Sequence, residues 1–244
     1  METGIQIQDD VFNRLEKVNG IFIDMLFDKN MTGPSNIVIE EKTYFRFMDF
    51  FYLNKPVHRL SLTEIVQVCE LRLQYLDKVL DKRLNSHIVR SMTNYVYSYF
   101  NHHATSHIAA LDFGCGSGLS LNLILNNLPN IELIGLDISH KAVQLASQTG
   151  VLVKHHKAGS RLPYKDSQLD LVFAVFVMHF QVGHSTISEI YRILNDRGIF
   201  IFNVYNIEPP NLRLFLAKSG FKAPKSIPPY DIPCNHKIYV CTKK

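Results

Sequence analysis

The chain has 244 residues, and 26 Lys and Arg against 22 Asp and Glu give a formal net charge of +4. It is 46% hydrophobic and 20% charged, which is ordinary for a globular protein and excludes a wholly disordered chain. The mild positive charge does not favour a nucleic-acid partner, and no apolar run reaches the ~18 residues of a membrane span. We therefore expect a soluble, cytoplasmic protein without a signal peptide or membrane span.

The cysteines and the clustered histidines do not predict a disulfide scaffold or a metal site. No CxxC pair occurs among the four cysteines, which fits a reducing compartment; they are Cys69, Cys115, Cys234 and Cys241. His102, His103 and His107 offer spacing for zinc, but no Cys, Asp or Glu lies close by in sequence. We interpret that segment as a solvated connector, and residues 154–157 with Arg161 as a surface edge.

The first 107 residues form one region in this interpretation. Apolar residues recur at steps of three and four over residues 10–27 and 62–100, which predicts helices. Ser61 and Glu64 have the spacing of a capping box at the start of the second helical stretch. Residues 37–52 fit either a strand or a helix. We expect a mainly helical extension over residues 1–107.

From residue 108 onward, apolar runs alternate with amphipathic segments. The pattern predicts strands over residues 108–113, 131–136, 151–153, 171–177, 199–204 and 237–242. It predicts helices over residues 119–128, 139–148, 185–194 and 212–218. Such alternation is typical of an α/β fold with a doubly wound, mostly parallel sheet.

A glycine-rich turn, LDFGCGSG over residues 111–118, follows the first of these strands. Ligands bind at this place in open α/β sheets, and glycines let the backbone approach them closely. A nicotinamide fingerprint needs glycine at the sixth position of G-x-G-x-x-G, where this chain has Leu119. The lysine of a phosphate-binding loop is missing as well.

Two acids favour a different ligand. Asp112 stands two residues before the first glycine, where its carboxylate can meet a cationic amine. Asp137 ends the second predicted strand and can accept both hydroxyls of a ribose, while Ile138 can lie against a flat base. The pattern therefore indicates a ligand with an amino-acid end, a ribose and a base, and without phosphate.

At these motifs the chain resembles the class I S-adenosylmethionine-dependent methyltransferases over residues 108–244, in particular the ubiquinone-biosynthesis-type and natural-product small-molecule group. The resemblance rests on LDFGCGSG, GLDIS at 135–139, LPY at 162–164 with LDLV at 169–172, VMHF at 177–180 and IYRILNDRG at 190–198. It implies a Rossmann-like catalytic domain with a seven-stranded sheet. S-adenosylmethionine would be the cofactor and S-adenosylhomocysteine the product.

The resemblance also implies which residues bind the cofactor. They are Asp112, Gly114, Cys115, Gly116, Gly118, Asp137, Ile138, Gly159, Ser160 and Phe176. Asp112 would face the methionyl amine, Asp137 the ribose, and Ile138 the adenine. One departure concerns the adenine contact, because the family often has an acid where this chain has Ala158.

Methyl transfer from a sulfonium asks mainly that the enzyme hold the acceptor in line and exclude water. A base is needed only when the acceptor must lose a proton. His179 is the candidate base, since it follows the fourth large strand and titrates near neutrality, and a purely structural histidine is the alternative. His184 and Tyr205 are weaker candidates.

The acceptor pocket is expected from residues 1–107, which would cap the cleft. The aromatic residues that suggest this are Tyr44, Phe45, Phe47, Phe50, Phe51, Tyr52, Tyr95, Tyr97, Tyr99 and Phe100. Their alternative role is the core of the extension or a homodimer contact. If the cap hypothesis holds, removing residues 1–60 abolishes acceptor turnover.

The function that follows is small-molecule biosynthesis by in-line transfer of a methyl group to a small apolar or aromatic acceptor, at O, N or C. An RNA or protein methyltransferase is the nearest alternative. The chain lacks a basic arm, and an Asn/Asp-Pro-Pro-Tyr tetrad is missing where it reads FVMH at 176–179. A second alternative is a protein that binds the cofactor and transfers no methyl, as a cyclase or binding module.

Overall fold

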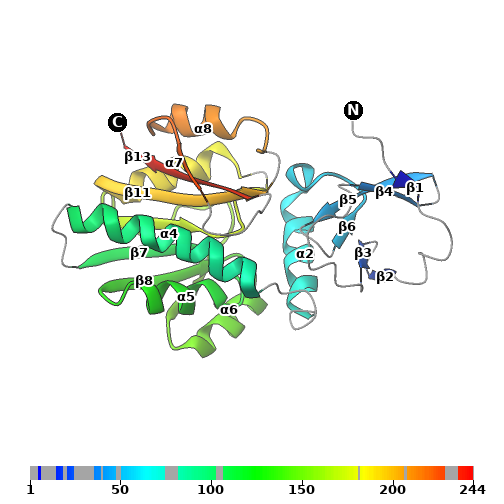
Figure 1. Cartoon of the computed structure of the whole chain (residues 1–244), viewed down its shortest axis with the longest axis horizontal. Coiled ribbons are helices and arrows are strands. Elements are labelled where there is room, and N and C mark those ends of the chain that lie inside the picture. Colours follow the sequence, from blue (N-terminus) through cyan, green and yellow to red (C-terminus); the bar gives the residue numbers. More distant parts are fainter. Residues whose placement is uncertain are drawn as a thin grey trace.

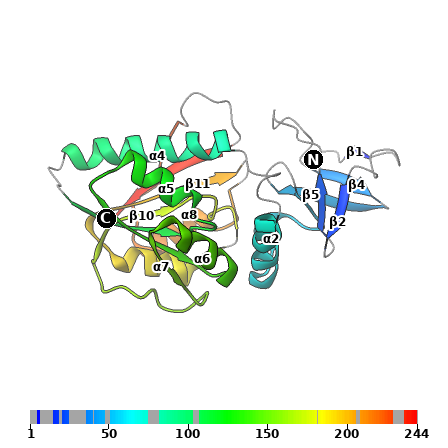
Figure 2. The same cartoon turned by 90° about the horizontal axis from the view of Figure 1, so that it is seen from below.

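The fold is taken from a computed structural model. It describes residues 5–6, 15–18, 21–24, 36–39, 41–47, 51–74, 82–102, 107–180, 182–205, 208–228 and 236–243. A large α/β part contains the C-terminal half of the chain, and a smaller sheet lies at the N-terminal end. Helix α2 (Leu62–Gln74) stands between the two in both views (Figure 1, Figure 2).

The large part is built on a seven-stranded sheet with the order β12-β13-β11-β10-β7-β8-β9. The strands are β7 (Ile108–Phe113), β8 (Ile131–Asp137), β9 (Leu152–His155), β10 (Leu169–Ala174), β11 (Leu194–Tyr205), β12 (Lys225–Ile227) and β13 (His236–Thr242). Five strands, which are neighbours in the sheet in the order β9-β8-β7-β10-β11, run parallel to one another. Strand β13 runs antiparallel to β11 and to β12. The predicted doubly wound, mostly parallel sheet is confirmed. The short strand β12 is not among the strands predicted from the sequence.

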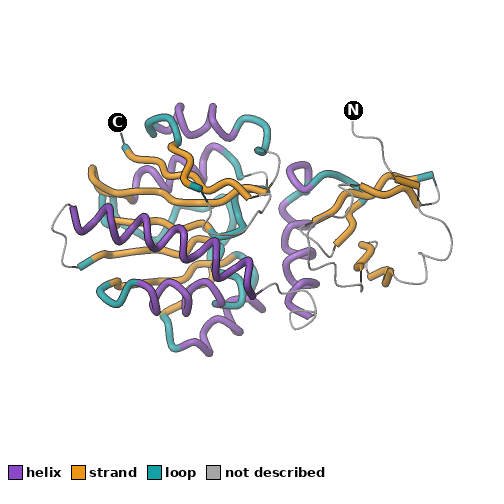
Figure 3. The backbone as a smooth tube through the Cα atoms, viewed as in Figure 1, coloured by secondary structure: helices purple, strands orange, loops and turns teal. Residues whose placement is uncertain are grey.

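Helices cover both faces of this sheet, as Figure 3 shows. They are α4 (Lys82–His102), α5 (Leu119–Asn127), α6 (His140–Ala146), α7 (His184–Ile193) and α8 (Leu212–Ser219), and a short turn η2 (Ser147–Thr149) extends α6. None of the helices within the described residues is long and apolar enough to cross a membrane.

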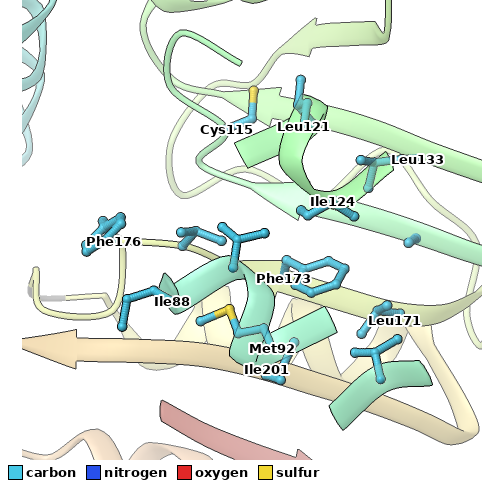
Figure 4. Packing of buried hydrophobic residues seen from close by; sticks show 14 of the residues in the cluster. Ile88, Met92, Cys115, Leu121, Ile124, Leu133, Leu171, Phe173, Phe176 and Ile201 are labelled. Atoms are coloured by element: carbon cyan, nitrogen blue, oxygen red, sulfur yellow. The ribbon is translucent and has the colours of Figure 1, made fainter. Parts of the chain in front are cut away.

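The core consists of two layers because side chains alternate along the buried strands. On β10, Leu171 and Phe173 pack with the apolar faces of α4 and α5, whereas Val172 and Ala174 pack with α7 and α8. Figure 4 shows the first layer, with Met92 of α4 close to Phe173 of the sheet. A strand apolar on both faces is what a central parallel position requires.

The N-terminal sheet contradicts one prediction. It has the order β1-β4-β5-β6-β3-β2, with β1 (Ile5–Gln6), β2 (Leu15–Val18), β3 (Ile21–Asp24), β4 (Asn36–Ile39), β5 (Lys42–Phe47) and β6 (Phe51–Leu53). The helix expected over residues 10–27 is therefore wrong where the chain is described, since β2 and β3 pair antiparallel. The sequence between them is Asn19-Gly20, a dipeptide typical of tight hairpins, and β-branched residues follow it.

The other uncertain segment is resolved as strands, because β4, β5 and β6 lie within residues 36–53. A short turn, η1 (Val57–Arg59), then leads into α2. The helix predicted over residues 62–100 is found as two helices, α2 and α4, and residues 75–81 between them lie outside the described part. The extension therefore combines helices with a sheet.

The capping box at the start of α2 is confirmed. The Ser61 backbone N–H donates to Glu64 Oε2 at 2.7 Å, and the Glu64 N–H donates back to Ser61 Oγ at 3.4 Å. Lys55 Nζ lies 2.6 Å from the other carboxylate oxygen of Glu64. These hydrogen bonds, Lys55 first, lower the pKa of Glu64 to about 2. These interactions therefore fix the residue at which α2 begins.

Candidate functional site

A cavity of about 380 Å³ lies at the carboxyl ends of β7, β8 and β10. The turns that follow these three strands line it from the sheet side, and α2 lines it from the other. Among the predicted site residues, the lining includes Gly114, Cys115, Gly116, Asp137, Ile138, Gly159 and Phe176. Asp112, Gly118, Ser160 and His179 are outside the lining. Cys115 and Phe176 lie at the same end of the sheet in Figure 4.

Each of the glycines in the turn is needed for a different physical reason. Gly114 and Gly116 both have positive φ angles, 76° and 56°. A Cβ on Gly114 would stand 2.5 Å from Val177 Cγ2, so this glycine lets the turn after β10 approach. A Cβ on Gly116 would meet no protein atom within 4 Å, so its absence leaves open space at the cavity wall. Gly118 instead packs on α6 and η2, because its Cβ would lie 3.1 Å from Ala146 Cα.

Asp137 organises the cavity wall at the end of β8. Its Oδ2 accepts the Gly116 N–H at 2.8 Å, and its Oδ1 accepts the Ser139 N–H at 2.9 Å. Burial raises the pKa of this carboxyl, and the backbone hydrogen bonds act against that shift. The carboxylate thus joins the glycine-rich turn to the start of α6, where Ser139 Oγ accepts the Ala142 N–H as the predicted helix cap.

Asp112 lies behind the turn and is fully buried. Its Oδ2 accepts the Ser120 hydroxyl at 2.5 Å, and its Oδ1 has no hydrogen-bond partner within the described residues. Burial, and to a smaller extent the nearby Asp137 carboxyl, raise the pKa of Asp112 to about 7 against the Ser120 hydrogen bond, which lowers it. Ser120, whose hydroxyl donates to this carboxyl, itself lines the cavity.

The candidate base His179 and the weaker candidate His184 lie outside the described cavity lining. His179 is buried, and its ring lies 4.4 Å from that of Phe180, centroid to centroid, outside the cavity lining. His184 is exposed at the start of α7. The Tyr205 side chain lies outside what is described. Ser160 is exposed, with its hydroxyl donating to Lys157 O at 2.6 Å.

His156 is the residue that sequence reasoning missed. It was expected on a surface edge, and this is wrong, because it is only 7% exposed and lines the cavity. Its backbone N–H donates to Asp137 O at 2.8 Å, which turns the chain inward just after β9. Burial is the main cause that lowers the pKa of His156. No local pattern marks this residue, since its sequence neighbours are exposed.

The wall opposite the sheet is aliphatic. Residues spaced along one face of α2 line the cavity: Leu62, Ile65, Val66, Cys69 and Leu73. None of the aromatic residues expected to form the acceptor pocket is among the described lining, and the rings that do line it are Phe113, Phe176 and Phe180. Ser139 Oγ donates to Glu70 Oε1 at 2.9 Å, which ties α2 to the start of α6.

The described lining contains no Lys or Arg side chain. Its charged or titratable groups are Asp137, His156 and the thiols of Cys69 and Cys115. Within the described ranges, no group of three or more His, Cys, Asp and Glu side chains is placed to hold a metal ion, and His103 falls outside those ranges.

Comparisons with known proteins show which proteins the α/β part resembles. Residues 111–202 match the family described as "Methyltransferase domain". Trans-aconitate 2-methyltransferase of Azoarcus sp. (strain BH72) is 30% identical over 112 residues, which are 45% of this chain and 44% of that protein. Demethylmenaquinone methyltransferase of Thermotoga maritima is 27% identical over 116 residues, 44% of this chain and 47% of that protein. The chain thus spans less than half the length of these curated relatives.

A solved structure shares the fold. The crystal structure of a SAM-dependent methyltransferase from Aquifex aeolicus superimposes with a TM-score of 0.54 at 14% identity, over 71% of this chain and 98% of that one. The family match falls on the glycine-rich turn, the Asp137 strand end and strands β10 and β11. Over residues 111–202 the α/β part of the chain therefore matches a methyltransferase domain, on a fold that it shares with a solved SAM-dependent methyltransferase.

Proposed function

We propose that the chain transfers a methyl group from S-adenosylmethionine to a small, uncharged and mainly apolar acceptor. The observation that carries this proposal is one cavity with two kinds of wall. The glycine-rich turn and Asp137 form the polar wall, and the aliphatic face of α2 forms the other. A cavity that joins a nucleoside-binding edge to an apolar surface suits a cofactor and an acceptor side by side.

The residues present fit this cofactor. Asp137 would accept the ribose hydroxyls with the lone pairs that its two backbone hydrogen bonds leave. The open space at Gly116 admits the methionyl part, and Ile138 offers an apolar surface beside the ribose end. The buried Oδ1 of Asp112 lacks a partner, and a methionyl ammonium near Ser120 would compensate the charge of that carboxyl.

When bound, S-adenosylmethionine supplies an electrophilic methyl group on its sulfonium sulfur. The chain's own residues then have to orient the acceptor and exclude water. α2 closes the cavity on the side away from the sheet, and Phe176 and Phe180 add apolar surface beside the glycine-rich turn. The base role of His179 stays a prediction, and the position of its ring outside the lining favours transfer without it.

The charge of the lining separates this chain from one of its relatives. A tricarboxylate such as trans-aconitate needs cationic side chains to compensate its charge when it leaves water. None of the described lining residues supplies such a cation. We therefore propose an acceptor unlike the one named for the Azoarcus relative.

The test is transfer of isotope-labelled methyl. The full chain is incubated with methyl-labelled S-adenosylmethionine and cell extract separated into apolar small molecules, anionic small molecules, RNA and protein. We expect label in an apolar small molecule by mass spectrometry, and none with a Gly116→Val variant, whose side chain fills the open space. Label in the anionic, RNA or protein fraction would refute the acceptor class. Calorimetric binding of S-adenosylhomocysteine without any labelled product would indicate a binding module.

A further inference from the structure

Phe176 has a backbone conformation that its residue type rarely adopts. Its φ is 59°, in the left-handed region. Of the non-glycine residues with positive φ in the described part of the chain, only Phe176 lines the cavity. A side chain with a Cβ persists in this conformation only when its surroundings hold it there, and such residues cluster at functional sites. The question is which residues hold Phe176.

The backbone of Phe176 is held from strand β11. Its N–H donates to Asn203 Oδ1 at 2.8 Å, and Asn203 is fully buried. A backbone N–H donates only, so this bond fixes which end of the amide is oxygen. Asn203 Nδ2 then faces His236 Nδ1 of β13 at 3.0 Å. Because the amide nitrogen donates, His236 Nδ1 is the acceptor and carries no proton.

The ring of Phe176 is held by the same pair of strands. It meets the His236 ring edge-on, with centroids 5.2 Å apart and planes at 89°. His236 is itself 3% exposed. Asn203 and His236 are both outside the described cavity lining, so two residues behind the wall fix both the backbone and the ring of the residue that forms it.

The consequence reaches the glycine-rich turn. The Cγ2 atom of Val177, the next residue, lies 2.5 Å from where a Cβ on Gly114 would stand, and both residues line the cavity. A change in the backbone at Phe176 would therefore move the surface against which the turn packs. The close packing at Gly114 leaves the turn little room to absorb such a shift.

We propose that Asn203 is a positioning residue, which with His236 holds Phe176 in its left-handed conformation and so sets the distance between the glycine-rich turn and the turn after β10. This role goes beyond the proposed function, because it concerns the shape of the cavity and not the identity of the acceptor.

The first test compares Asn203→Leu with Asn195→Leu. Asn195 lies on the same strand and also bonds a backbone N–H, that of Arg197, and a side chain, Asp170, away from the cavity. Leaving a buried donor without an acceptor has a free-energy cost that corresponds to roughly a 10- to 100-fold change in an equilibrium constant. We expect Asn203→Leu to weaken S-adenosylhomocysteine binding by at least about tenfold in calorimetry, and Asn195→Leu to leave it within about threefold. Equal effects of the two variants would overturn the proposal.

Two further variants keep the test independent of a folding failure. Asn203→Asp retains an oxygen for the Phe176 N–H but loses the donor to His236, and we expect a loss of binding smaller than that of Asn203→Leu. His236→Phe retains a ring against Phe176 but cannot accept from Asn203, and we expect a loss smaller than that of Asn203→Leu. Unchanged binding in His236→Phe together with a full loss in Asn203→Asp would contradict the arrangement.

A double-mutant cycle separates this proposal from the proposed function. Glycine adopts the left-handed region without strain, so Phe176→Gly should remove most of the need for Asn203. In thermal unfolding, Asn203→Leu should lower the melting temperature clearly less in the Phe176→Gly background than in the unmodified chain. Additive effects would overturn the positioning role. This measurement needs no ligand, so it remains decisive even if the chain binds no S-adenosylhomocysteine and the proposed function fails.

Discussion

The carboxyl groups of Asp112 and Asp137 lie at the ends of the adjacent strands β7 and β8, and they differ in their hydrogen-bond partners. Asp137 accepts two backbone N–H groups and lines the cavity, and these hydrogen bonds oppose part of the pKa rise that burial causes. Asp112 has one hydroxyl partner and is fully buried. The pKa of Asp112 at about 7 reflects that difference, because burial disfavours the charged form.

Asp112→Asn should make the ligand-free chain more stable at alkaline pH. The pKa of this group rises from 3.8 to about 7 on folding, so the native state keeps a proton that the unfolded chain has released. The resulting stability is present at low pH and is lost as the pH rises through about 7. The variant should therefore gain at most about 4 kcal/mol at pH ~8.5 and less at pH ~5.5. Melting temperatures at the two pH values check this, and a gain that is larger at the lower pH would contradict it.

His179→Phe should change kcat/KM by less than about threefold, because the imidazole lies against Phe180 and outside the cavity lining. A general base contributes typically about 100-fold or more. The measurement is the pH–rate profile with the acceptor found by methyl labelling. A fall of about 100-fold, with loss of the acidic limb of the profile, would restore the histidine as the base.

Among the elements, α2 connects the N-terminal extension to the α/β part. Its first turn is fixed by Ser61, Glu64 and Lys55, and its middle is tied to α6 through Glu70 and Ser139. Between these points the apolar face of α2 lines the cavity. The helix therefore determines the apolar side of the site without contributing a residue to the glycine-rich turn.

Val66→Arg should lower acceptor kcat/KM by at least about tenfold while leaving S-adenosylhomocysteine affinity within about threefold. A cation on the apolar face opposes an uncharged acceptor and fills part of its space. Gln67→Arg is the matched control, since the neighbouring residue is exposed and outside the lining. Steady-state kinetics and calorimetry on both variants provide the measurement. If Val66→Arg behaved like its control, α2 would not form the acceptor wall.

At the scale of the whole molecule, every described lining residue falls between Leu62 and Thr186. The N-terminal sheet contributes none of them, although the sequence places half of the expected aromatic pocket there. The cap hypothesis is thereby narrowed from residues 1–107 to α2, with Asn85 of α4 as a polar neighbour. The boundary at residue 107 and a homodimer contact through the extension stay predictions.

Removal of residues 1–60 and of residues 1–81 should have different effects. The shorter deletion keeps α2 and should keep acceptor kcat/KM within about tenfold, contrary to the expectation from sequence. The longer deletion removes the apolar wall and should abolish turnover, while S-adenosylhomocysteine binding persists because the glycine-rich turn and Asp137 remain. Turnover and calorimetry on both chains check this. Loss of turnover already in the shorter chain would return the acceptor role to the N-terminal sheet.

Local patterns were sufficient for the elements whose physics is local. Alternating apolar runs predicted the parallel strands, the Ser61 and Glu64 spacing predicted a helix start, and the glycine-rich turn predicted where the cavity lies. The helix expected over residues 10–27 failed because a spacing of three and four also occurs by chance in a short hairpin. There, Asn19-Gly20 was the stronger signal.

By itself, the sequence determined the α/β order, the edge of the sheet where the cavity lies and the two acids at the ends of adjacent strands. Only the tertiary structure decided that α2 forms the apolar wall, that His156 faces inward while His179 does not, and that Asn203 and His236 hold Phe176. The physical reason is the range of the interactions. Periodicity and turn chemistry act over a few residues, whereas burial and hydrogen-bond pairing depend on which distant segments the fold brings together.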